Sequence, residues 1–174
     1  PELNLFERYY SNATPEIDSR FLIKDIEVWK SIQTIGKDPA KERLANAFID
    51  LTSRLVGAKY PETLREDILP VPGNSESGRF RLLTKGDDYN LNEYTGFLTF
   101  NTQINNDDII AVAYRVENQQ GAQDDGFYGE FITTAATDSQ RLILKLIKPA
   151  NLQPGGNFAQ AWKLQLKNIY PVGG

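Results

Sequence analysis

The 174-residue sequence contains no histidine, no cysteine and no methionine. Without histidine, the chain lacks the side chain that most often serves as a general base near neutral pH. Without cysteine, it has no disulfide, no thiol nucleophile and no thiolate ligand for zinc. These absences favour a function that depends on a binding surface, and we expect no catalytic, cofactor-binding or metal-binding residues.

The sequence also lacks a positive charge excess and a long apolar run. Lys and Arg number 19 against 23 Asp and Glu, which gives a net charge of -4. Nucleic-acid binding needs clustered basic side chains, so we expect no nucleic-acid partner. No run approaches the roughly 18 apolar residues of a membrane-spanning helix, and no signal peptide opens the chain. We therefore expect residues 1–174 to form one soluble β-rich module, and the missing Met suggests a module excised from a longer chain.

Short apolar segments separated by turn residues predict a sheet built largely from hairpins. In the first of them, Phe21, Ile23 and, after a one-residue slip, Ile26 and Val28 alternate with polar residues. Such a period of two is typical of a strand with one solvent-facing side. Further strands are predicted in the segments RFRLLT, YNL, GFLTF, DIIAVAYRVE, FYGEFI, RLILKLIK and WKLQLK.

Two of these strands carry more specific predictions. Both faces of residues 109–116 are mostly apolar, so this strand should be central and covered on both sides. In residues 141–148, Leu142, Leu144 and Leu146 should face inward. The lysines at 145, 148, 163 and 167 are expected to be solvated. Together the pattern predicts a mainly β fold, an antiparallel, jelly-roll-like β-sandwich with one or two short helices.

The region before residue 79 is harder to interpret. Residues 38–57 fit a helix through Leu44, Phe48, Leu51 and Leu55, but their alternation at residues 45–51 fits a strand equally well. The segment PETLREDIL at 61–69 is compatible with a short helix, and VPGNSESG at 71–78 reads as a loop.

Several phrases in the C-terminal half occur in a recognisable order: an Asp-Tyr pair before Thr95-Gly96-Phe97, the strand DIIAVAY, a Gly-Glu-Phe step, KLIKP, and WKLQLKNIY. In this order they resemble a module of SprA and Sov, the giant outer-membrane translocon proteins of type IX secretion and gliding motility in Bacteroidota. The residues that carry the resemblance are Asp88, Tyr89, Gly96, Tyr114, Gly129, Glu130, Lys145, Pro149, Trp162, Lys167, Asn168 and Tyr170.

The resemblance implies a non-enzymatic part of a protein-export pore at the cell outer membrane, in its periplasmic or surface-exposed portion. The parent chain would span the membrane while this module does not. Its partners would be other secretion-system subunits and exported protein chains. The likeness is weaker before Phe80, although it favours a strand at residues 47–51, and Leu164-Gln165-Leu166 departs from it where the family has methionines.

Other readings of the same residues remain open. The pairs Asp87-Asp88, Asp107-Asp108 and Asp124-Asp125 could hold calcium, although solvated turn carboxylates explain them as well. Glu130 could serve a glycosidase as one of two carboxylates, or be structural. The aromatic residues could fill a core or form a sugar-stacking platform, which would make the chain a cell-surface carbohydrate-binding β-sandwich. They are Trp29, Tyr94, Phe97, Tyr114, Phe127, Tyr128 and Trp162.

Overall fold

The computed structural model describes residues 9–15, 22–36, 38–117, 125–134, 140–150 and 156–165. The larger sheet contains β1 (Ile23–Ile32), β2 (Glu42–Phe48), β3 (Ser75–Leu82), β6 (Ile110–Val116), β7 (Gly126–Tyr128) and β8 (Leu142–Lys148). A second sheet is the hairpin of β4 (Tyr89–Asn92) and β5 (Phe97–Phe100). The short helices are η2 (Pro39–Lys41), η3 (Glu62–Arg65), η5 (Ile132–Thr134), η6 (Gly156–Phe158) and α2 (Ala159–Gln165).

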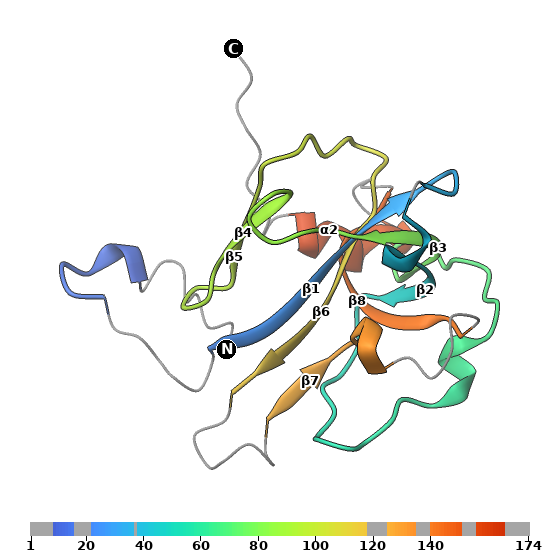
Figure 1. Cartoon of the computed structure of the whole chain (residues 1–174), viewed down its shortest axis with the longest axis horizontal. Helices are drawn as coiled ribbons and strands as arrows, with labels where there is room; N and C mark the ends of the chain where they lie inside the picture. Colours follow the sequence, from blue (N-terminus) through green and yellow to red (C-terminus); the bar gives the residue numbers. More distant parts are fainter. Residues whose placement is uncertain are drawn as a thin grey trace.

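Five strands of the larger sheet close into a barrel (Figure 1). Their order is β1-β3-β2-β8-β6, and β6 pairs again with β1, so the ring has no free edge. The pairings are antiparallel except for β2 with β8, which run parallel. The predicted mainly β class is confirmed. The predicted antiparallel sandwich is not, because one sheet curls round to meet itself and one of its pairings is parallel.

The barrel interior is filled by side chains of strongly unequal size, as a small barrel requires. Alanines on β2 and β6 face leucines on β8 and the rings of β1 and β3. The buried members of this inner cluster on the strands are Trp29, Ala45, Ala47, Phe80, Ala111, Ala113, Leu142, Leu144 and Leu146. The alternation predicted for β8 is therefore confirmed, since all three named leucines face inward.

Two apolar layers cover the outside of the barrel. The β4–β5 hairpin packs Tyr89 and Leu91 against Val28, Ile110 and Val112 on the outer faces of β1 and β6. Residues 51–66, which we call the strap, pack over β2 and β8. There the apolar contacts are Leu51, Tyr60, Leu64, Phe48 and Ile143. Strand β6 thus buries side chains on both faces, as the sequence predicted for residues 109–116.

Strands β6 and β8 separate beyond their first paired residues. Residues 129–130, which we call the wedge, fill the space between them. Strand β6 pairs with β8 through Ile110–Val112 and then with β7 through Tyr114–Val116. After β7 the chain turns at Gly129, and Glu130 lies beside β8. The Glu130 amide donates to the Ile143 carbonyl at 2.8 Å, while the Ile143 amide donates to the Glu130 side chain at 3.1 Å. A carboxylate oxygen thus replaces a backbone acceptor in the sheet.

Arg65 on the strap holds this wedge in place. Its two terminal nitrogens donate to the two carboxylate oxygens of Glu130 at 2.7 and 2.6 Å. Nη1 also donates to the Arg141 carbonyl at 3.1 Å. The two side chains are 13% and 9% exposed. Paired, fork-to-fork geometry of this kind gives the strongest charge-assisted hydrogen bonds. We call this contact the Arg65–Glu130 joint.

The structure settles the segments that the sequence left open. Residues 42–48 form strand β2, because Ala45 and Ala47 fit the narrow barrel interior, and Pro39 begins only the short η2. The helix expected in PETLREDIL is limited to η3. The slip in the first strand is a β-bulge between Ile23 and Asp25.

Three predictions of secondary structure were wrong in whole or in part. In the predicted strand FYGEFI only Phe127 and Tyr128 belong to β7, and Ile132 begins η5. Strand β3 begins at Ser75, inside the predicted loop, because pairing with β2 along its whole length outweighs the turn preference of its serines and glycine. The strand predicted around Trp162 is instead helix α2. Ala161 and Leu164, three residues apart on one side of the helix, contact the inner cluster. Ala, Gln, Leu and Lys all favour helix.

The turn at Gly129 predicts a stability test. Gly129 has φ +77°, and a Cβ there would lie 2.9 Å from the Val112 carbonyl oxygen and 3.1 Å from the Ala113 Cα. Gly57 has φ +76° but nothing within 4 Å. Gly57→Ala should cost only the left-handed penalty of about 1–2 kcal/mol. Gly129→Ala should cost about 2 kcal/mol more, because the β6 backbone must shift.

Urea denaturation of both variants measures this difference in the free energy of unfolding. Equal losses at the two positions would show that β7 and β6 do not approach as closely as described.

Candidate functional site

The inner face of β1 becomes polar toward the N-terminal end of the strand. Asp25, Glu27 and Trp29 share this face, and they pair with Arg115, Ala113 and Ala111 of β6. Because Trp29 and both alanines belong to the inner cluster, Glu27 lies on the barrel side of β1. We predicted that the polar side of this strand faces solvent. That was wrong for Glu27, because closing the barrel turns this face inward.

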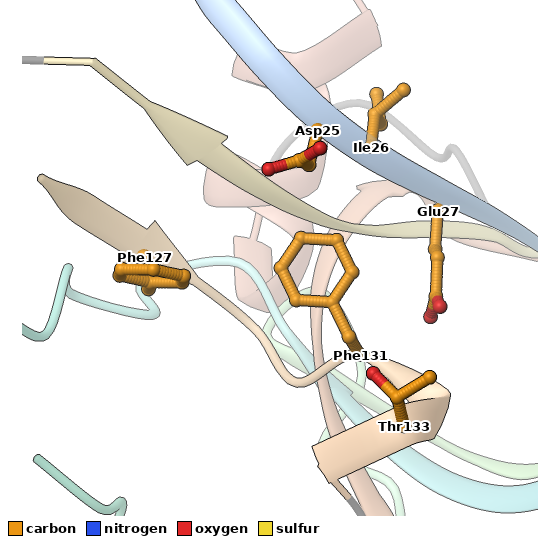
Figure 2. A pocket seen from close by; sticks show the side chains of 6 residues that line it. All are labelled: Asp25, Ile26, Glu27, Phe127, Phe131 and Thr133. Atoms are coloured by element: carbon orange, nitrogen blue, oxygen red, sulfur yellow. The ribbon is translucent and has the colours of Figure 1, made fainter. Parts of the chain in front are cut away.

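Aromatic side chains from another part of the chain complete a pocket at this end of the barrel. Phe127 comes from β7, Phe131 follows the wedge, and Thr133 lies in η5. The Phe127 and Phe131 rings meet edge to face, with centroids 6.5 Å apart and planes at 86°. Figure 2 shows both rings on the side of β1 that carries the two carboxylates, with Ile26 directed the other way. We call this recess, of about 400 Å³, the mouth pocket.

Around the mouth pocket, some carboxylates have a cationic partner and one has none among the described residues. Arg115 donates from Nε to Asp25 at 2.6 Å and from Nη1 to Asp125 at 2.8 Å. One guanidinium therefore serves two carboxylates, and Asp125 is only 1% exposed. The ion pairs found in the described part of the chain include none to Glu27.

Glu27 is instead held by neutral donors. The Ile132 amide donates to its Oε2 at 2.9 Å. The Trp29 indole nitrogen also lies close and favours the charged carboxylate, although its geometry falls short of a hydrogen bond. Burial raises the pKa of Glu27 above its ordinary value of 4.5, and these two donors only partly oppose that rise. Glu27 is thus a partly buried acid whose charge has no cation beside it in the described structure.

The strap borders the same region through Arg54. Its guanidinium lies 5.4 Å from the ring centroids of both Tyr60 and Phe127. It also donates to the Ala58 and Gly129 carbonyls at 2.9 and 3.3 Å. The Arg54 backbone exchanges two hydrogen bonds with Phe127, at 2.9 and 2.8 Å. The outer edge of β7 is therefore paired at Phe127, which fixes that wall of the pocket.

The residues that carry the family resemblance lie mostly at turns and strand pairings that hold the fold together. Gly129 and Glu130 form the wedge described above. Asp88 accepts from the Thr84 amide at 2.8 Å and so closes the turn before β4. Tyr89, 2% exposed, anchors the hairpin in the outer cluster. Gly96 has φ +71° in the turn between β4 and β5. Each of these residues serves the fold.

Three more of these residues lie on the barrel strands or just beyond them. The Tyr114 ring stacks on Tyr128 of β7 with centroids 4.7 Å apart, on the outer face. Pro149 is fully buried directly after β8. Lys145 was predicted to be solvated, but its ammonium donates to the Ile49 and Leu51 carbonyls at 2.5 and 3.2 Å. The prediction failed because the strap passes over that face of β8.

The prediction that Lys148 is solvated was also wrong. Its ammonium donates to the Asn106 and Asp108 carbonyls at 2.9 and 2.6 Å, and burial lowers its pKa. Lys163 is exposed on α2, as expected. Trp162 is partly buried on α2, whereas Lys167, Asn168 and Tyr170 lie outside the described residues.

One member of each acidic pair, Asp88, Asp108 or Asp125, accepts a hydrogen bond in a turn or forms an ion pair. Asp108 accepts from the Asn105 amide at 2.6 Å and pairs with Lys30 at 2.7 Å, while Asp125 pairs with Arg115. Asp124 lies outside the described residues. Among the residues that the structure describes, no three His, Cys, Asp or Glu side chains converge to hold a metal ion.

The sequence pattern did not indicate the mouth pocket. Phe127 was among the candidate aromatic residues, but Glu27, Phe131 and Thr133 were not among the candidates. One signal was present: Glu27 lies two residues from Trp29, so both share a face. A strand that buries a tryptophan on the same face as a glutamate places that acid near a core.

The fold defines a small β domain with a closed, side-chain-filled barrel. Within the described ranges, no helix is both long and apolar enough to cross a membrane. Compared with models of known protein families the chain matches none, and no curated protein matches it either. The resemblance to SprA and Sov therefore stays a prediction.

The environment of Glu27 predicts how stability depends on pH. Because the pKa of Glu27 is higher in the folded than in the unfolded chain, folding favours its protonated form. That stabilisation is complete below about pH 4.5 and is lost as pH rises through the folded-state pKa. Glu27→Gln keeps an acceptor for Ile132 and removes the charge. It should therefore raise the free energy of unfolding at pH 7, with a gain that shrinks toward pH 4.

Urea denaturation across this pH range measures the effect, and Glu66→Gln, at an exposed position, is the matched control that should change little. A loss of stability at pH 7 in Glu27→Gln would mean that the fold stabilises the charged form.

Proposed function

We propose that the chain is a non-enzymatic scaffold and interaction module of a SprA-like outer-membrane translocon, as used in type IX secretion and gliding motility. In this role a rigid barrel presents loops to other secretion-system subunits or to exported chains. The module itself lies on the periplasmic or outer side of the membrane, and the parent chain crosses it.

One observation supports a scaffold role above the others. The residues of the resemblance that the structure describes lie mostly where they build the fold, at the wedge, at the turn before β4, at the hairpin turn and under the strap. The side chain of Glu130, which could have been a catalytic acid, accepts three hydrogen bonds from Arg65 and Ile143. Motif residues with such roles preserve a shape, which is what an interaction module needs.

Exposed apolar side chains on loops supply surface for partners. Ile35, Leu69 and Tyr94 are 69%, 89% and 47% exposed. They lie on three different connections, after β1, after η3 and between β4 and β5. Strands or a short helix fix where each of these connections begins and ends.

A second candidate function is carbohydrate binding, favoured by a group of surface tyrosines. Tyr9 stacks on Tyr94 with centroids 6.3 Å apart and planes at 7°, and it meets Tyr10 edge to face at 5.0 Å. Tyr10 is 59% exposed. Flat rings with polar tips suit sugar stacking. Saturable oligosaccharide binding that is lost in Tyr94→Ala would favour this function over the translocon.

The translocon proposal predicts a partner in the cell. A photoreactive amino acid at position 35, 69 or 94 should cross-link to a secretion subunit or an exported chain, because these side chains project from the barrel. The same label at Phe80, 0% exposed, is the matched control and should capture nothing. An antibody to the module should detect a polypeptide far longer than 174 residues in the outer-membrane fraction.

Detection of a short secreted protein, or labelling no greater at the exposed positions than at Phe80, would contradict this proposal.

A further inference from the structure

The mouth pocket combines an uncompensated carboxylate with aromatic walls. Within the described residues, Arg115 is shared by Asp25 and Asp125, and Glu27 has only neutral donors. A partly buried carboxylate is costly unless a cation or several hydrogen bonds compensate it. Because Glu27 lies at the wall of an open pocket, a bound ligand could supply the cation that the described residues do not.

We propose that the mouth pocket binds one cationic side chain, a lysine or arginine of another protein chain. The Glu27 carboxylate pairs with the ammonium or guanidinium group, and the Phe127 and Phe131 rings contact its aliphatic stem and the positive charge. A cation within about 6 Å of an aromatic face is attracted by the ring quadrupole. The Thr133 hydroxyl can accept a further N–H.

Charge and size both argue for this occupant. Asp25 is already paired with Arg115, so an anion entering the pocket would meet mainly the carboxylate of Glu27, which would repel it. Ligand pockets range over roughly 300–1,000 Å³. At about 400 Å³ the mouth pocket is at the small end of that range, which suits one side chain better than an oligosaccharide.

Contacts around the pocket hold its walls in place before a ligand binds. Phe127 is held by its paired hydrogen bonds to Arg54, and Phe131 packs against the inner cluster. The Ile132 amide fixes one oxygen of Glu27. The pocket therefore needs little rearrangement to bind, which lowers the entropic cost of association. This inference goes beyond the proposed function, because it holds whichever larger assembly contains the chain.

The test is an NMR titration of the purified chain, with the Ile132 amide as reporter because it donates to Glu27. The probes are blocked lysine and blocked arginine amides, with blocked norleucine amide as the uncharged control of similar stem. A single residue of this size should bind with a Kd on the order of 1 mM. Norleucine amide should bind roughly tenfold more weakly, since it lacks the charge-assisted contact.

Three variants distinguish binding at Glu27 from non-specific attraction between the probe and the negatively charged protein. Glu27→Gln should weaken lysine amide binding roughly tenfold while its amide spectrum shows an intact fold. Asp87→Asn removes an exposed carboxylate in the turn before β4 and should leave binding unchanged. Phe127→Leu should weaken binding of the charged probes more than that of norleucine amide, because it removes the ring and keeps an apolar wall.

Two further titrations test whether the bound cation belongs to a protein chain or to a free amine. A short peptide with one central lysine should bind at least as tightly as free cadaverine, and tighter cadaverine binding would overturn the assignment to a protein chain. Unchanged lysine binding in Glu27→Gln, equal binding of norleucine amide, or Ile132 shifts caused only by soluble oligosaccharides would each overturn the proposal.

Discussion

The Arg65–Glu130 joint is the interaction on which the rest of this structure depends. Strands β6 and β8 diverge, and the sheet stays continuous only because Glu130 takes the place of a strand residue beside Ile143. A buried carboxylate in that position is unfavourable unless a cation is supplied. Arg65 supplies it from the strap, so the wedge and the strap stabilise each other. Removing Arg65 would leave an uncompensated charge in the wall of the barrel, whereas Arg65 without Glu130 would keep its ion pair with Glu62 at 3.1 Å.

The joint also connects the scaffold to the mouth pocket. The wedge begins where β7 ends and leads directly to Phe131 and η5, so its position fixes both aromatic walls. Around it, side chains of the barrel donate to backbone carbonyls of the chain that passes over it: Asn46 to those of Leu64 and Glu66, Lys145 to those of Ile49 and Leu51. These backbone carbonyls of the chain near the joint thus have side-chain donors. Glu130 has a cation beside it, whereas Glu27 has none within the described residues, and this contrast supports a binding role for the pocket.

Much of the secondary structure could be predicted from the sequence, because alternation reports which residues share a face. It indicated both faces of β6, the inward leucines of β8 and even the bulge near Ile23. It could not indicate partners: the closing pair β1–β6 and the parallel pair β2–β8 join segments far apart in the chain. For the same reason Lys145 looked solvated and Glu27 solvent-facing. At α2, an alternating pattern shorter than two helical turns fitted either structure.

The central claim is tested most directly by a double-mutant cycle across the joint. Arg65→Met, Glu130→Gln and the double variant are compared by urea denaturation, with the Ile143 amide followed by hydrogen exchange. Arg65→Met leaves a buried charge and should cost about 3–5 kcal/mol. The double variant should be more stable than the sum of the single losses predicts, by more than about 1 kcal/mol, and Ile143 should lose protection most in Arg65→Met. Additive losses, with Ile143 protection unchanged, would show that the barrel closes without the joint.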